Sequence, residues 1–183
     1  MNSKRIVLLT GPPGAGKGTQ AELLAARRGW DNFSIGQLLR ETVSGEIRTM
    51  VESGQLLPAK EVVQLVFDQL ASSSGPVIVD GFPRRLDQAQ EFEVTRARLG
   101  YQVPLVIHLY ITAEESWNRL ISRGRVDDAR VVWERRWEEY TAKTLPAVAF
   151  YKSSANLIEV DGSGDIPTVA ELVEEAVRAS EDR

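Results

Sequence analysis

Gly11–Thr19, with the sequence GPPGAGKGT, follows the apolar run Ile6–Leu9 and precedes a helix-forming segment from Gln20 to Arg28. A phosphate-binding P-loop requires this order of apolar strand, glycine-rich turn and helix. The glycines let backbone N–H groups point at an anion without a Cβ in the way, and the N-terminus of the helix is electropositive. Lys17 adds a full charge that can reach the outer phosphates. The stretch therefore predicts a site for phosphate groups.

Strand-like and helix-like segments alternate along the rest of the chain. Strands are expected at Ile6–Leu9, Val77–Val79, Val106–Ile111 and Leu157–Val160. Helices are expected at Ala21–Arg28, Lys60–Ala71, Leu86–Leu99, Ala113–Ser122, Arg130–Ala142 and Val169–Ala179. This alternation predicts an α/β fold, a P-loop three-layer α/β/α arrangement whose mostly parallel sheet is covered on both faces. In such a sheet, ligands bind at the carboxyl ends of the strands.

Length and composition narrow the possible classes of protein. The 183 residues fit one domain, residues 1–183, and the net charge of −4 argues against a nucleic-acid binder. The chain has no cysteine and a single histidine, which excludes a disulfide framework and a zinc site built from Cys and His. No apolar run approaches transmembrane length, and no signal peptide precedes the first strand. We therefore expect a cytoplasmic protein with no membrane partner.

Two stretches interrupt the alternation. Residues 31–60 contain helical pieces at Gly36–Val43 and Glu46–Glu52 with no long strand between them, and are expected to form a small helical insertion. Residues 123–135 begin with an irregular, charged segment between two helices and are expected to form a very short lid.

Asp80 ends the buried-type strand Val77–Asp80. In P-loop proteins, an acid at the end of a neighbouring strand holds magnesium, or the waters of magnesium, beside the phosphates. The alternative is an aspartate that caps a turn before Gly81. Since magnesium usually keeps several waters, the expected contact of Asp80 with Mg²⁺ is through water.

The residue after Lys17 is Gly18, and the hydroxyl comes one position later at Thr19. This variant, with four further motifs in the same order along nearly the whole chain, resembles the adenylate kinase family of nucleoside monophosphate kinases. The motifs are Ser34–Arg40, Ser53–Pro58, Asp80–Arg84 with Gln88 four positions later, and residues 123–128 followed by Arg136 and Tyr140.

The resemblance implies a role for each matching position. Lys17, Arg84, Arg123, Arg125 and Arg136 are expected to surround the transferring phosphoryl group as catalytic residues. ATP is expected to contact Gly14, Ala15, Gly16, Lys17, Gly18, Thr19, Arg119, Arg123 and Gly164. The nucleoside monophosphate is expected to contact Ile35, Arg40, Leu57, Gly81, Arg84, Gln88, Arg125 and Arg136. Several guanidinium groups and Mg²⁺ would supply positioning and positive charge, the main needs of phosphoryl transfer.

The implied reaction is reversible, Mg²⁺-dependent transfer from ATP to AMP, giving two ADP, by a monomer. In the family, glutamine at the position of Gln88 accompanies adenine, and its amide can both donate to and accept from a base edge. Ile35 and Gln37 stand where the family motif has Thr and Asp. Two alternatives therefore stay open: a kinase for CMP, UMP or GMP, and a nucleotide-binding module with weakened catalysis.

Other conspicuous residues are interpreted as structural. His108 lies inside a strand and is expected to be a hydrogen-bonded core or edge residue. Trp133 and Trp137 are four apart on one helix face, a spacing typical of packing. Glu174, with its acidic neighbours, is expected on a solvated helix face.

Overall fold

The computed structural model describes residues 4–42, 57–123, 129–154 and 156–181, without the side chains of residues 40, 42 and 123. Its centre is a five-stranded sheet with the order β2-β3-β1-β4-β5, in which every pairing is parallel. The strands are β1 (Ile6–Thr10), β2 (Asp31–Ser34), β3 (Val77–Asp80), β4 (Leu105–Tyr110) and β5 (Leu157–Asp161). The predicted α/β class and parallel sheet are confirmed.

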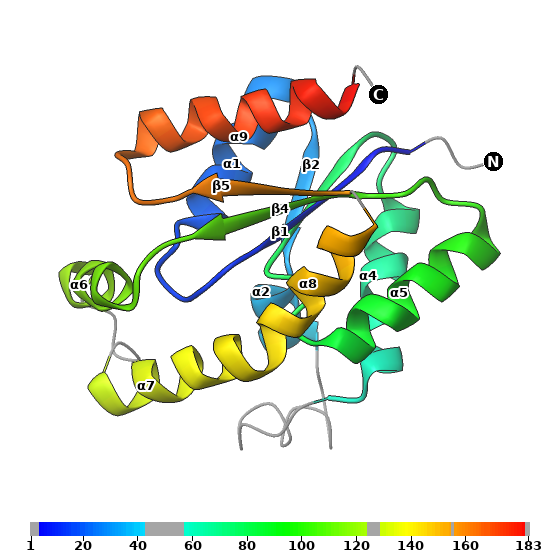
Figure 1. The fold of residues 1–183 in the computed structure, drawn as a ribbon. Helices are drawn as coiled ribbons and strands as arrows, with labels where there is room; N and C mark the ends of the chain where they lie inside the picture. Colours follow the sequence, from blue (N-terminus) through cyan, green and yellow to red (C-terminus); the bar gives the residue numbers. More distant parts are fainter. Residues whose placement is uncertain (1–3, 43–56, 124–128, 155, 182–183) are drawn as a thin grey trace.

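Helices cover both faces of the sheet (Figure 1). They are α1 (Lys17–Arg28), α2 (Ile35–Thr42), α4 (Ala59–Ser72), α5 (Leu86–Leu99), α6 (Ala113–Arg123), α7 (Arg130–Glu139), the π-helical turn η1 (Tyr140–Thr144), α8 (Leu145–Ser153) and α9 (Ile166–Glu181). Helices α1 and α9 lie on one face, and α4, α5 and α8 on the other. Among the described residues, no helix is long and apolar enough to cross a membrane.

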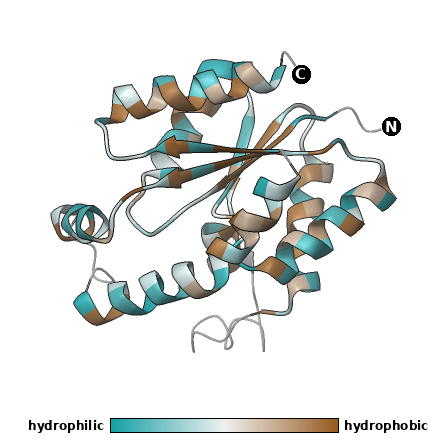
Figure 2. Ribbon diagram, in the orientation of Figure 1, coloured by the Kyte–Doolittle hydropathy of each residue, from teal (hydrophilic) through white to brown (hydrophobic). Residues whose placement is uncertain are grey.

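The side chains of β1 point alternately to the two faces of the sheet, and they belong to two separate parts of the hydrophobic core. Ile6 and Leu8 pack with apolar residues of α4, α5 and α8, whereas Val7 and Leu9 pack with apolar residues of α1 and α9. Successive strand residues point to opposite faces, so a strand buried on both sides must be apolar throughout, as β1 is. The brown segments at the centre of Figure 2 show this buried apolar layer.

Two elements were not expected from the sequence. β2 has the sequence DNFS, with one apolar residue, because it is an edge strand that is only partly buried. Helix α8 contains Pro146 in its first turn and directly continues the π-helical turn η1. The expected helix Glu46–Glu52 lies outside the described residues.

The expectation of a solvated face on α9 is wrong for Glu174. Its side chain is buried against α1, where Glu174 Oε1 accepts from Arg28 Nη2 at 2.6 Å and from Arg28 Nε at 2.9 Å. These charge-assisted hydrogen bonds hold the pKa of Glu174 below its ordinary value, and Arg178 adds to the effect. The periodic pattern of α9 could not show this, because the partner guanidinium lies on another helix.

Glu174→Gln is expected to lower the free energy of unfolding at pH 7 by about 1.5–3 kcal/mol, since it removes a buried ionic acceptor. The pKa of Glu174 is depressed in the folded state, so its contribution is present above the ordinary carboxyl range and is lost as the pH falls through the folded-state pKa. Urea unfolding of both proteins between pH 7 and pH 3 measures this. The control is Glu175→Gln, at the exposed neighbouring position. An equal loss of stability in Glu175→Gln contradicts the account. So does a stability difference between Glu174→Gln and the wild type that does not depend on pH.

Candidate active site

The parallel pairing of β1 with β3 brings two loops to the same edge of the sheet. Leu9 is in register with Asp80, and the Gly81 N–H donates to the Leu9 carbonyl at 2.9 Å. The P-loop follows β1, and the segment Gly81–Gln88 follows β3. Both loops therefore leave the carboxyl ends of adjacent strands, which is where ligands bind in open parallel sheets.

The P-loop backbone adopts conformations that need glycine. Gly14 and Gly16 have φ angles of 75° and 87°, in the left-handed region that glycine occupies without strain. Gly16 is the N-cap of α1, and neither a capping side chain nor an acidic residue occupies the first turn. The helix thus presents its N-terminal N–H groups and its positive dipole end toward the loop. This backbone arrangement is suited to binding an anion.

Lys17 folds back over the P-loop in this structure. Its Nζ donates to the carbonyl oxygens of Gly11 at 3.0 Å and Pro12 at 2.8 Å. The ammonium group is therefore held within the loop that would bind phosphates.

Asp80 lies directly beside the P-loop. A Cβ added to Gly18 would stand 3.5 Å from Asp80 Oδ2, so the Asp80 carboxylate lies close to the backbone of Gly18. Asp80 Oδ1 is buried and has no hydrogen-bond partner among the described residues. Within the same ranges, no group of three or more His, Cys, Asp or Glu side chains could hold a metal by itself. This environment fits one carboxylate that binds a hydrated cation.

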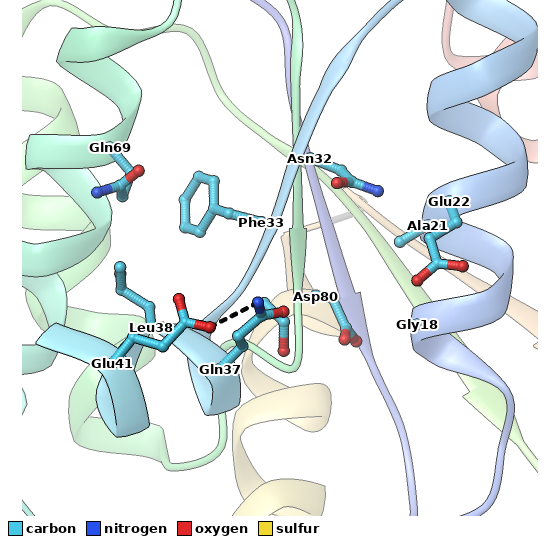
Figure 3. A pocket seen from close by; sticks show the side chains of 11 residues that line it. Gly18, Ala21, Glu22, Asn32, Phe33, Gln37, Leu38, Glu41, Gln69 and Asp80 are labelled. Atoms are coloured by element: carbon cyan, nitrogen blue, oxygen red, sulfur yellow. Dashed lines mark hydrogen bonds between the residues drawn. The ribbon is translucent and has the colours of Figure 1, made fainter.

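A cleft of about 340 Å³ opens beside Asp80 and Gly18 (Figure 3). Elements α1, β2, α2 and α4 form its walls, and Gln37 lies in it, with Gln37 Nε2 donating to Glu41 Oε1 at 2.8 Å. Phe33 and Leu38 add apolar surface. The cleft thus extends from Asp80 and Gly18, at the edge of the P-loop, to the helix that carries the Ser34–Arg40 motif.

The loop after β3 is braced by its own side chains. Gln88 Oε1 accepts from the Arg84 backbone N–H at 2.9 Å, and Arg84 Nε donates to the Gly81 carbonyl at 3.0 Å. Gln88 is buried, although it lies in the first turn of α5. Arg84 itself is exposed at the edge of the sheet, and the Thr10 hydroxyl donates to the Pro83 carbonyl at 3.1 Å. Thr10 was not singled out from the sequence.

Two further pairs of sequence-predicted positions lie close together in the structure. Ile35 and Leu57 are buried in the core cluster that contains Phe82. Arg119 Nη2 donates to the carbonyl oxygens of Ser163 at 3.0 Å and Gly164 at 3.2 Å, so the two expected ATP contacts are adjacent.

The structure describes only some of the arginines that are expected at the transferring phosphoryl group. Arg136 on α7 is half-buried and its neighbour Arg135 is exposed. Arg125 and the side chains of Arg40 and Arg123 lie outside the described part of the chain, so their expected roles stay predictions.

His108 is confirmed as a hydrogen-bonded core residue. It is buried in β4, and its Nε2 lies 2.9 Å from the Tyr140 hydroxyl. Burial lowers the pKa of His108, which keeps the ring neutral, and raises the pKa of Tyr140 to about 12, which keeps the hydroxyl protonated. Trp133 and Trp137 stack with their ring centroids 5.9 Å apart, as their spacing predicts.

The fold and the loops define a P-loop nucleotide-binding protein. A family model described as adenylate kinase matches residues 9–156. Three curated relatives carry the name adenylate kinase: those of Prochlorococcus marinus (strain MIT 9211; 36% identity, 95% of this chain and 97% of the relative), Maricaulis maris (strain MCS10; 36%, 90% and 94%) and Caulobacter sp. (strain K31; 33%, 93% and 97%). The chain belongs to the adenylate kinase family.

Gly11→Ala is expected to destabilise the fold by about 3 kcal/mol or more, because its Cβ would stand 2.2 Å from the Leu109 carbonyl oxygen and β4 would have to move. Gly29→Ala is the control: it has φ 65° with nothing within 4 Å and should cost only about 1–2 kcal/mol. Thermal and urea unfolding measure both values. Equal losses in the two variants would show that the P-loop does not depend on close contact with β4.

Proposed function

We propose that the chain catalyses reversible phosphoryl transfer between ATP and AMP, giving two ADP. Family membership and the named relatives support the reaction class. The observation that carries the proposal is the juxtaposition of the P-loop and the loop after β3, which the register of Leu9 with Asp80 holds at one sheet edge. We propose that the chain acts as a monomer.

The donor half of the proposed site is the P-loop. Backbone N–H groups of residues 14–19 and the N-terminus of α1 would bind the ATP phosphates. Lys17 Nζ would exchange the Gly11 and Pro12 carbonyls for phosphate oxygens, which offer a stronger, charge-assisted hydrogen bond. Arg119 and Gly164, already in contact, would lie beside the adenosine of ATP.

The acceptor half is the loop after β3. Arg84 and Arg40 would bind the phosphate of the monophosphate, and Gln88 would face its base. Gln88 Oε1 already accepts one hydrogen bond from Arg84, which fixes the orientation of the amide. An amide held in this way can present a donor and an acceptor to a base edge.

The positive charge around the transferring group would come from Lys17 and the arginines at 84, 123, 125 and 136. Between Arg136 and its neighbour Arg135, the half-buried Arg136 is our assignment, because an exposed side chain is held less firmly. Donors that are fixed before the reaction stabilise charge in the transition state without reorganising.

Asp80 is the residue that fits magnesium, since Oδ1 is buried without a partner among the described residues and lies beside Gly18. Asp80 would hold the ion through water. Gln37 and Glu41 line the same cleft and can accept from such waters. Bound magnesium supplies charge neutralisation at the transferring phosphates.

A kinase for another monophosphate is the second candidate, because Ile35 lacks the hydroxyl of the family motif. A coupled assay of ADP formation with ATP and each of AMP, CMP, UMP and GMP separates the candidates. We expect kcat/KM for AMP to exceed the others by about 100-fold or more, the discrimination expected when a polar amide is left unpaired by the wrong base. If AMP were among the poorest acceptors, the assignment of the acceptor would be wrong.

Lys17→Ala and Arg84→Ala are each expected to lower kcat by about 100-fold or more, because each removes a positively charged side chain beside the transferring phosphoryl group. The melting temperature should change little, since neither side chain belongs to the core. Arg135→Ala is the matched control on α7 and should keep its turnover. Near wild-type turnover in either of the first two variants counts heavily against the mechanism.

A further inference from the structure

Helix α7 continues without a break into the π-helical turn η1. Such turns are rare and are frequently found at functional sites. Arg136 lies three residues after Trp133 and four before Tyr140, so the three share one face of the helix. Trp133, Tyr140 and Thr144, at the far end of η1, are all buried. This face connects Arg136 to both halves of the proposed site.

At its N-terminal end, α7 is tied to the P-loop through one hydroxyl group. Trp133 Nε1 donates to Ser116 Oγ at 2.9 Å, and Ser116 Oγ donates to the Pro13 carbonyl at 2.7 Å. Ser116 is fully buried in α6, and the ring of Trp133 packs between Trp117 and Trp137, with centroid distances of 5.5 and 5.9 Å. Loss of the Ser116 hydroxyl would leave the Pro13 carbonyl and the indole N–H without this partner.

At the other end, η1 is tied to the acceptor loop. The Thr144 hydroxyl donates to the Arg84 carbonyl at 2.9 Å. Between the two ends, Tyr140 is hydrogen-bonded to His108 in β4. The segment is thus held to the P-loop, to the central sheet and to the acceptor loop in succession.

We propose that α7–η1 is a rigid spacer between the two phosphate-binding loops, and that Ser116 and Thr144 are positioning residues which fix Arg136 relative to both. The inference rests on the proposed roles of Arg136 and Arg84. Neither hydroxyl contacts a substrate in this account. Each acts by holding the helix, because a displacement of about 1 Å in a catalytic group can cost about 100-fold in rate.

The test compares Ser116→Ala and Thr144→Val with the wild type, at a temperature where all three are folded. Each is expected to lower kcat about 10- to 100-fold. The dissociation constants of ATP and AMP, measured separately by calorimetry, should change less than about threefold, since the binding loops remain. Thr144→Ser restores the hydroxyl and should restore kcat. A melting temperature that falls while kcat stays unchanged would contradict the inference.

Matched controls remove a hydroxyl that only contacts its own helix. The controls are Thr141→Val and Ser122→Ala. Thr141 lies in the same π-helical turn as Thr144, and Ser122 lies in the same helix as Ser116. Both side chains are exposed, and each hydroxyl donates to a backbone carbonyl three or four positions earlier. Both controls should keep kcat. Trp133→Phe keeps an aromatic ring at this position, removes the N–H donor and should reproduce Ser116→Ala; wild-type kcat in this variant contradicts the inference.

A double-mutant cycle with Arg136→Ala separates the inference from the proposed function. If the two hydroxyls act through Arg136, Ser116→Ala and Thr144→Val should reduce kcat further by less than about twofold once Arg136 is absent. Losses that multiply overturn the spacer inference and leave the proposed reaction intact. If Arg136→Ala alone leaves kcat unchanged, the assigned role of Arg136 fails, and the spacer inference fails with it.

Discussion

The parallel pairing of β1 with β3 is the constraint on which the site depends. It places the P-loop and the loop after β3 at one sheet edge, with Leu9 opposite Asp80. Both strands are buried on both faces, so a shift in register would expose or misplace the apolar side chains of the whole core. The stability of the core and the spacing of the P-loop and the loop after β3 therefore have the same physical origin.

Buried hydroxyl groups then connect the loops to the rest of the molecule. Thr10 joins β1 to Pro83, Ser116 joins the P-loop to α7, and Thr144 joins η1 to Arg84. A buried hydroxyl that both donates and accepts, as Ser116 does, fixes two groups at once, and leaving either without a partner is costly. The site is thus organised by short polar contacts between elements that are far apart in the sequence.

The motifs could be predicted because they are local. The sequence around Gly11–Thr19 predicts a strand, a turn and a helix in one continuous segment, and Asp80 ends a strand of the buried type. The missed features depend on distant partners. Nothing in the local pattern of α9 shows that Arg28 lies against Glu174, and nothing around Thr144 shows that the Arg84 carbonyl lies 2.9 Å away. Strand β2 was missed because an edge strand needs few apolar residues.

The central claim is that the two loops form one site for two nucleotides. A crystal structure with a bisubstrate dinucleotide, in which a phosphate chain joins two adenosines, tests it most directly. The account predicts that the phosphate chain runs from the backbone N–H groups of residues 14–19 to Arg84, that Lys17 Nζ has left the Pro12 carbonyl, and that one adenine lies beside Gln88. An adenosine bound away from the loop after β3, with Lys17 still on its carbonyl partners, would contradict the claim.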